Sequence, residues 1–271
     1  MHSTEEKLAA FERLLKIMGE LREQCPWDRK QTFDTLRHLT IEETYELSEA
    51  IMDADLDEIR KETGDLLLHM VFYAQIASET PREQGGWDIA DSLNGICDKL
   101  IDRHPHIYGD VEADDEETVK ANWEQLKLKE GKKSVLEGVP KGLPSLVKAY
   151  RIQDKVRGVG FDWEHAGQVW DKVQEELAEF QAEVDVDADR ATDEFGDVLF
   201  ALVNYARFKG INPDEALERT NRRFQARFQH MEAAIQADAS AGGKSMAEMS
   251  LKELDAYWNQ AKSALSSASS K

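Results

Sequence analysis

Apolar residues recur at helical spacing along most of this chain. Near its start, one amphipathic face is formed by Leu8, Phe11, Leu14, Leu15 and Met18. Residues three or four apart share a face of a helix, so this spacing predicts a helix that packs on a core. Runs of β-branched residues with alternating polarity are nearly absent, and Gly and Pro are sparse. The pattern therefore predicts an all-α protein.

The acidic positions repeat between the two halves of the chain. Residues 42–77 and residues 175–206 both read Glu-Glu-x-x-Glu, a polar connector, Glu-x-x-Asp and then an apolar helix. The acids of the first stretch are Glu42, Glu43, Glu46, Glu62 and Asp65. The acids of the second stretch are Glu175, Glu176, Glu179, Glu194 and Asp197. An order of features that recurs in this way indicates two related units.

The parallel continues downstream of the acids. Lys99 and Arg103 lie four residues apart in the first half, as Arg223 and Arg227 do in the second. Farther on, Trp123 in "NWEQLK" parallels Trp258 in "YWNQAK". We predict a tandem repeat of two helical-bundle domains. The N-terminal domain spans residues 1–130, a linker rich in Gly, Pro and Ser spans 131–145, and the C-terminal domain spans 146–271.

Local signals predict where the helices begin and end. The acidic segments "MDADLDE" and "VDVDADR" are turns between two helices, so each half contains a helical hairpin with acids on both arms. Thr40 is the expected N-cap of the first arm, with Glu43 closing a capping box. Pro105 is expected to end the helix that carries Lys99 at His104, whereas the matching helix in the second half continues.

The spacing of the acids predicts a metal site in each half. Glu176 with Glu179 and Glu194 with Asp197 each share a helix face, so folding the hairpin brings four carboxylates together. Glu43, Glu46, Glu62 and Asp65 form the matching second site. Such groups repel one another and need cations. A set of oxygen ligands without Cys or His selects Mg²⁺, with Mn²⁺ as a substitute.

Two other interpretations of the acids remain. A single Glu-Glu-x-x-Glu motif is often only a solvated helix face. A di-iron carboxylate bundle would contain Glu-x-x-His, and His69 does follow Asp65 by four residues. The matching residue of the second half is Ala201, so the repeat keeps the acids and loses the histidine. His69 is therefore expected to be a core or rim histidine, and iron is disfavoured.

Basic residues accompany the acids. Arg223 and Arg227 lie one helical turn apart and can hold one anion, or they form a basic surface strip. Lys172 lies four residues before Glu176, on the metal-facing side. Cations beside bound Mg²⁺ are suited to a polyphosphate. Trp258 either stacks on a base or packs in the core.

Composition limits the partners. The chain has 271 residues and a net charge of −20, a field that repels nucleic-acid backbones and anionic membrane surfaces. No run of about 18 apolar residues is present, and the charged N-terminal segment is unlike a signal peptide. Cys25 and Cys97 have no metal-type spacing. We expect a cytoplasmic protein with reduced thiols that binds neither nucleic acid nor membrane.

These motifs resemble the long, two-domain form of the MazG family of nucleoside triphosphate pyrophosphohydrolases. Besides the acids, the resemblance rests on "CPWDRKQTF" (Cys25 to Phe33), "RHPHIYGD" (Arg103 to Asp110) and "VGFDW" (Val159 to Trp163). It covers nearly the whole chain. It implies an all-α homodimer that cleaves NTPs and dNTPs, with Mg²⁺, between the α- and β-phosphates to NMP and pyrophosphate. The family role it implies is the removal of surplus or aberrant nucleotides.

The resemblance also implies roles for individual residues. Glu176, Glu179, Glu194 and Asp197 would bind the metal. Lys172, Arg223, Arg227 and Trp258 would contact the nucleotide. Glu175 would orient or deprotonate the attacking water, although a supporting role beside the ligands is an equal alternative. A different function class also remains, a non-enzymatic acidic scaffold that binds a partner protein, and so does a di-metal carboxylate bundle of other activity.

The two halves are not expected to be equivalent. The residue that matches Lys172 in the first half is Leu39, which cannot neutralise a phosphate. The first-half basic pair, Lys99 with Arg103, contains a Lys where the second half has Arg223, and Lys lacks the bidentate fork of Arg. We therefore expect the second half to carry the main activity.

Overall fold

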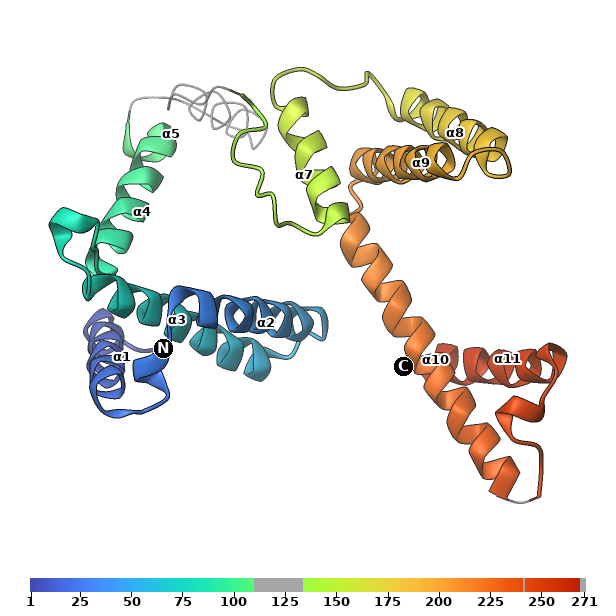
Figure 1. Cartoon of the computed structure of the whole chain (residues 1–271), viewed down its shortest axis with the longest axis horizontal. Coiled ribbons are helices and arrows are strands. Elements are labelled where there is room, and N and C mark those ends of the chain that lie inside the picture. The colour runs from blue at the N-terminus through green and yellow to red at the C-terminus, as the bar shows by residue number, and fades with distance from the viewer. Residues whose placement is uncertain (110–133, 241, 269–271) are drawn as a thin grey trace. The chain divides into compact units, whose positions relative to one another are not determined.

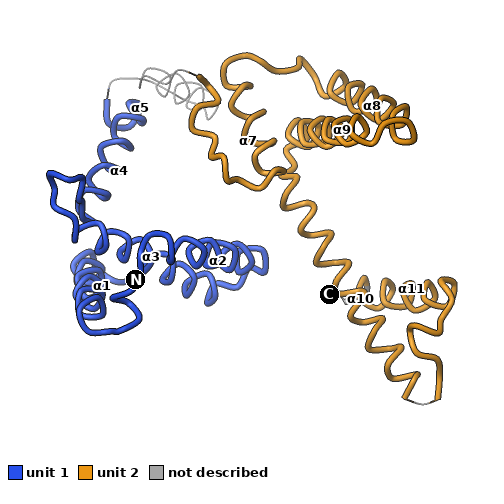
Figure 2. The backbone as a smooth tube through the Cα atoms, in the orientation of Figure 1, with its two compact units in different colours: residues 1–112 blue, residues 113–271 orange. Residues whose placement is uncertain are grey.

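The chain is described by a computed structural model over residues 1–109, 134–240 and 242–268. No β-strand occurs in these ranges, which confirms the all-α prediction. The chain divides into two compact units, residues 1–112 and 113–271 (Figure 2). Trp123 and the predicted domain boundary at residue 130 lie outside the described residues.

Unit 1 is built around a helical hairpin. Its described helices are α1 (Thr4–Gln24), α2 (Phe33–Met52), α3 (Leu56–Ser78), α4 (Ile89–Arg103) and the short α5 (Pro105–Tyr108) (Figure 1). Helices α2 and α3 form the hairpin, and α1 packs on α3. The core contains Met18, Leu36, Val71 and Phe72. Met18 completes the predicted face of α1, on which Phe11, Leu14 and Leu15 also pack against this core.

The start of α2 corrects one prediction. Thr40 is not an N-cap, because it lies in the middle of α2. The cap is Thr32, whose side chain accepts a hydrogen bond from the backbone N–H of Thr35. The helix thus begins about two turns earlier than predicted, because the apolar face extends back to Leu36, which is 1% exposed. Helix α4 ends at Arg103, before Pro105, as predicted.

Unit 2 repeats the hairpin. Its described helices are α7 (Ser145–Arg157), α8 (Ala166–Glu183), α9 (Ala188–Phe208), α10 (Pro213–Ser240) and α11 (Leu251–Ala268) (Figure 1). Helices α8 and α9 pair, and α7 packs on α9. Helix α10 is uninterrupted, as predicted, and packs against α11 through Met231, Ile235 and Ala261.

The acidic turn of each hairpin supplies the N-cap of the second arm. Asp55 precedes α3, and its side chain accepts hydrogen bonds from the backbone N–H groups of Asp57 and Glu58. Asp187 precedes α9 and accepts in the same way from Asp189 and Arg190. These caps fix where the second arm of each hairpin begins, and therefore which residues face the first arm. Across the described residues, no helix combines the length and apolar content needed to cross a membrane.

Candidate metal and nucleotide site

The buried face of α8 ends in a carboxylate. Val169 and Val173 are 1% and 0% exposed, and Glu176 follows on the same face at helical spacing. Glu176 is itself only 7% exposed. A carboxylate is seldom buried to this degree without a partner, because it loses its hydration. The packing of α8 on α9 therefore forces an acid into a place where it needs a cation.

Helix α9 presents two more acids to Glu176. One carboxylate oxygen from each of Glu176, Glu194 and Asp197 lies within 4.8 Å of the others. Burial raises the pKa of Glu194, and the charges of Glu179, Asp197 and Glu176 raise it further. Glu179 is exposed and lies outside this trio, although its charge acts on Glu194. We call Glu176, Glu194 and Asp197 the unit 2 trio.

Unit 1 contains the same arrangement. Glu43, Glu62 and Asp65 each contribute an oxygen to a second group within 4.8 Å, the unit 1 trio. Burial raises the pKa of Glu43, as do the charges of Asp65 and Glu46. Glu62 Oε2 is buried and has no hydrogen-bond partner. Glu46, like Glu179, is exposed and outside its trio.

Both trios fit a hard divalent ion. Each offers three carboxylates from two helices, with no Cys or His among them, which is the donor set that Mg²⁺ and Mn²⁺ prefer. The orphaned Glu62 Oε2 is the kind of atom that an ion satisfies, since a buried acceptor without a partner is costly. The donor chemistry thus agrees with the divalent metal sites that the sequence predicts.

Lys172 lies against the unit 2 trio. Its Nζ is 2.8 Å from Glu175 Oε1 and 2.7 Å from Glu176 Oε1. These two hydrogen bonds raise the pKa of Lys172 above its usual value, so the ammonium stays charged. The matching residue Leu39 packs partly buried against the core of unit 1. The two trios therefore differ in the cation placed beside them.

The layer beneath the trios also differs. In unit 1, Thr40 Oγ1 lies 2.7 Å from His69 Nδ1 and 2.5 Å from the Tyr73 hydroxyl oxygen. His69 is 8% exposed, and burial lowers its pKa, so it is the buried, hydrogen-bonded histidine that the sequence predicts. In unit 2 the matching positions of Thr40 and His69 are the buried Val173 and Ala201.

A pocket of about 540 Å³ opens beside the unit 2 trio. Lys172, Glu176 and Asp197 line one part of it. The aromatic side chains that line it are Phe161, Trp163 and Phe200, which are 79%, 44% and 42% exposed. Sequence reasoning used "VGFDW" only for the family resemblance and assigned these residues no role. Exposed aromatic residues in a loop directly before the acidic helix were the signal that could have located the pocket.

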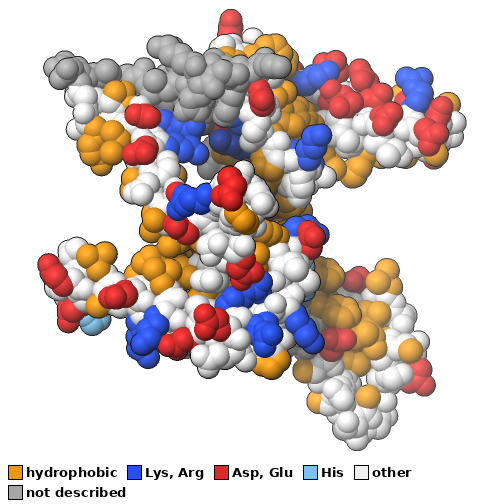
Figure 3. Space-filling model, turned by 60° about the vertical axis from the view of Figure 1, so that its left-hand side comes forward, with side chains coloured by type: hydrophobic (Ala, Val, Ile, Leu, Met, Phe, Trp, Pro, Cys, Tyr) orange, Lys and Arg blue, Asp and Glu red, His pale blue; other side chains and the backbone are white. Residues whose placement is uncertain are grey.

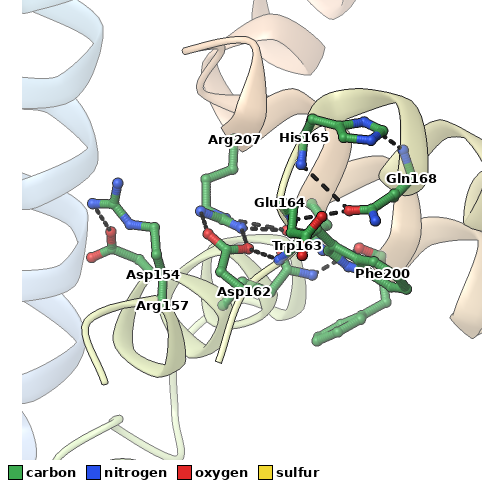
Figure 4. A network of polar contacts seen from close by, with 11 residues as sticks. Asp154, Arg157, Asp162, Trp163, Glu164, His165, Gln168, Phe200 and Arg207 are labelled. Carbon is green, nitrogen blue, oxygen red and sulfur yellow. Dashed lines mark hydrogen bonds and ion pairs between the residues drawn. The ribbon is translucent and has the colours of Figure 1, made fainter. Parts of the chain in front are cut away.

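An ion pair holds the aromatic loop on α9. Arg207 Nη1 donates to Asp162 Oδ2 at 2.9 Å, and its other terminal nitrogen donates to Asp162 Oδ1, so the two groups face each other (Figure 4). The side chain of Arg207 is 7% exposed and that of Asp162 is 19% exposed. A bidentate Arg–carboxylate pair fixes direction as well as distance. Asp162 lies between Phe161 and Trp163, so this pair positions both aromatic rings at the pocket.

Two polar side chains also line the pocket. Gln153 Nε2 donates to the backbone oxygen of Phe200 at 2.8 Å, which fixes the direction of its amide. Gln153 Oε1 is then left buried without a hydrogen-bond partner. Asn204 Oδ1 accepts two bonds from Arg207, at 2.8 and 3.2 Å. The pocket thus combines aromatic walls with a few fixed polar groups, as small-molecule sites do.

The other predicted nucleotide contacts are not gathered at this pocket. Arg223 donates to Thr220 on its own helix, and Arg227 Nε is buried without a partner. Trp258 packs against Phe224, with ring centroids 5.0 Å apart, and joins the α10–α11 core. None of these three lines the pocket. In unit 1, Lys99 and Arg103 lie on α4, whereas the acids lie on α2 and α3.

Comparison with known proteins gives the family. The model of the MazG nucleotide pyrophosphohydrolase domain matches residues 31–108, which lie in unit 1. Nucleoside triphosphate pyrophosphohydrolase of Escherichia coli strain K12 is 41% identical over 93% of this chain and 97% of its own length. The chain belongs to the MazG family. The resemblance predicted from the motifs is thereby confirmed.

Two further relatives show how far the similarity extends. Nucleoside triphosphate pyrophosphohydrolase/pyrophosphatase MazG of Thermotoga maritima is 41% identical over 93% of this chain and 95% of its own length. The uncharacterised protein YabN of Bacillus subtilis is 44% identical over 95% of this chain, which matches 53% of that protein. Matches of this length include most of unit 2, so the MazG relationship is not confined to the hairpin of unit 1.

Proposed function

We propose that this nucleoside triphosphate pyrophosphohydrolase depends on Mg²⁺ and cleaves NTPs and dNTPs between the α- and β-phosphates, releasing NMP and pyrophosphate. We further propose that unit 2 carries the main activity. The observation that supports this most directly is the meeting of three elements in one place. The acidic trio, the ammonium of Lys172 and the aromatic pocket all adjoin one another in unit 2.

The proposed roles follow from these positions. Glu176, Glu194 and Asp197, with the nearby Glu179, hold the metal. A divalent ion held there would neutralise the triphosphate and would make a water molecule more acidic. Lys172 contacts a phosphate, since its ammonium lies at the edge of the trio and lines the pocket. Glu175, 2.8 Å from Lys172 and exposed, orients the attacking water or deprotonates it.

The pocket is the proposed site for the nucleoside. A base can stack on Trp163, Phe161 or Phe200, because every base has an apolar face. An N–H group of the base or sugar can satisfy the buried Gln153 Oε1. Within one chain, three predicted nucleotide contacts do not line this pocket, namely Arg223, Arg227 and Trp258. We propose that they contact the nucleotide only if a second copy of the chain brings them to the pocket.

A homodimer is supported by the surface of the α8–α9 hairpin. Apolar side chains are exposed among charged ones on the face shown in Figure 3. The α8–α9 hairpin exposes four large apolar side chains that are between 39% and 44% exposed, those of Trp170, Leu177, Leu199 and Leu202. Exposed apolar side chains grouped on packed helices are typical of surfaces that another subunit covers.

We also propose a cytoplasmic location for the protein. The free thiols of Cys25 and Cys97 are compatible with that location.

The products test the reaction. Incubation with an NTP and Mg²⁺ is expected to yield NMP and pyrophosphate, because the proposed reaction hydrolyses the bond between the α- and β-phosphates. Chromatography of the nucleotide and an assay for pyrophosphate measure both products. Excess EDTA is expected to abolish turnover, and Mn²⁺ to restore it. NDP with orthophosphate as products, or full activity in EDTA, would contradict the proposal.

The two units can be compared by removing acids in matched pairs. Glu179→Ala/Asp197→Ala is expected to lower kcat by about 10² to 10⁴, because ligands of the metal are lost. Glu46→Ala/Asp65→Ala removes the matching acids of unit 1 and is expected to leave most of the activity. Steady-state assays on several NTPs, with circular dichroism to verify folding, give the result. Loss of activity in the unit 1 variant alone would reverse the assignment.

The pocket is tested by removing one aromatic wall. Trp163→Ala is expected to raise KM for NTPs about tenfold, because stacking of a base on an aromatic ring contributes about 1–3 kcal/mol. Trp27→Ala is the matched control, since Trp27 is 55% exposed and precedes the acidic hairpin of unit 1. Steady-state kinetics of both variants decide. An unchanged KM in the Trp163 variant would contradict the proposal that the nucleoside binds in this pocket.

Sedimentation velocity tests the dimer. The protein is expected to sediment as a dimer at micromolar concentration, and Leu199→Asp/Leu202→Asp to shift it towards the monomer, because charges are costly in a buried apolar contact. Leu251→Asp, at a 75% exposed position of α11, is the control and is expected to leave the dimer intact. A monomeric parent protein would contradict the homodimer.

A further inference from the structure

Lys172 is paired with a carboxylate that a metal ion in unit 2 needs, that of Glu176. Its Nζ lies 2.7 Å from Glu176 Oε1, and Glu176 is the most buried member of the unit 2 trio. A second contact, 2.8 Å to Glu175 Oε1, holds the ammonium in the same position. An ammonium at hydrogen-bond distance from a ligand carboxylate repels a divalent cation that approaches the same carboxylate. The lysine and the ion therefore compete for Glu176.

The ammonium of Lys172 can also reach a second anionic partner, the phosphates of a substrate. Its side chain is 36% exposed and lines the pocket together with Asp197, on the side where the phosphates of a substrate would meet the trio. Lysine has a flexible four-carbon stem and a compact charge, so it can exchange one anion for another without a change in the helix. A triphosphate in the pocket offers such an anion.

We propose that Lys172 exchanges between Glu175–Glu176 and the substrate phosphates, and thereby makes the binding of metal and of nucleotide in unit 2 mutually dependent. This inference rests on the metal and phosphate sites of the proposed function. Nucleotide draws the ammonium away from Glu176 and leaves that carboxylate free to bind the ion. Because coupling between two ligands is reciprocal, the ion strengthens nucleotide binding by the same factor.

Unit 1 contains a natural comparison. Leu39 stands at the position of Lys172 and packs against the core of unit 1, so no ammonium is supplied to Glu43 from that position. In both trios, one oxygen from each of three carboxylates lies within 4.8 Å of the others. The unit 1 trio is therefore expected to bind a divalent ion with little dependence on nucleotide, whereas the unit 2 trio depends on it strongly.

Calorimetric titration with Mn²⁺ tests this inference. The parent protein is the full chain carrying Glu43→Ala/Asp65→Ala, so that only unit 2 is measured. Without nucleotide, Lys172→Met is expected to bind Mn²⁺ about tenfold more tightly than the parent, because a charge-assisted contact that opposes the ion is removed. An α,β-methylene NTP, which resists cleavage at that bond, is expected to tighten Mn²⁺ binding in the parent about tenfold more than in the variant.

Two variants serve as controls. Lys172→Arg keeps the charge and is expected to bind Mn²⁺ without nucleotide as the parent does. Lys244→Met removes a lysine that pairs with Glu253 at 2.6 Å and lies outside the trio and its pocket, and it is also expected to match the parent. Circular dichroism of each variant verifies the fold.

The outcomes separate this inference from the proposed function. Equal Mn²⁺ affinity in Lys172→Met and the parent, with or without the analogue, would overturn the exchange while leaving the metal site in place. A parent that binds no Mn²⁺ under either condition, and that loses no activity in EDTA, would overturn the metal site and the exchange together.

Discussion

Mutual repulsion between carboxylates, imposed by the packing of two helices, is the constraint on which the rest of this structure depends. Val169 and Val173 are buried where α8 meets α9, and Glu176 is buried with them because it continues their face. Glu194 and Asp197 approach it from α9. The apolar contacts stabilise the hairpin and hold charges at distances they would not adopt alone. A cation site is the direct consequence.

The two units compensate this repulsion in different ways. Unit 2 places Lys172 beside its most buried acid. In unit 1, Leu39 replaces the lysine, and the layer beneath the acids is the polar network of Thr40, His69 and Tyr73. A duplicated backbone arrangement has thus kept the acids but changed their neighbours. Because the neighbours set the charge of the site, two similar trios can differ in metal and substrate binding.

An arginine with a largely buried side chain fastens the loop before the acidic hairpin in both units. In unit 2, Arg207 of α9 holds Asp162, between the two aromatic residues of the loop. In unit 1, Arg22 of α1 donates to Glu79 at 2.6 and 3.0 Å and to the backbone oxygen of Gln31 at 3.0 Å. The arginines come from different helices, yet each joins this loop to the end of the second hairpin arm or its cap. In unit 2 the result is a pocket with aromatic walls beside the trio.

The sequence by itself determined the helices, the repeat, the two acid sets and the family. Helical periodicity and i, i+3 spacing are local properties, so the placement of Glu62 with Asp65 and of Glu194 with Asp197 on one face follows from the chain alone. The start of α2 was misjudged at Thr40, because the burial of Leu36 against Met18 and Phe72 depends on other helices.

Only the tertiary structure decided that Glu176 is buried and that Lys172 bonds to it. It also decided which aromatic residues line a pocket, namely Phe161, Trp163 and Phe200. It also separated Arg223, Arg227 and Trp258 from that pocket within one chain. Spacing along a helix gives direction around its axis but no distance to another helix, and distances between helices are set by packing.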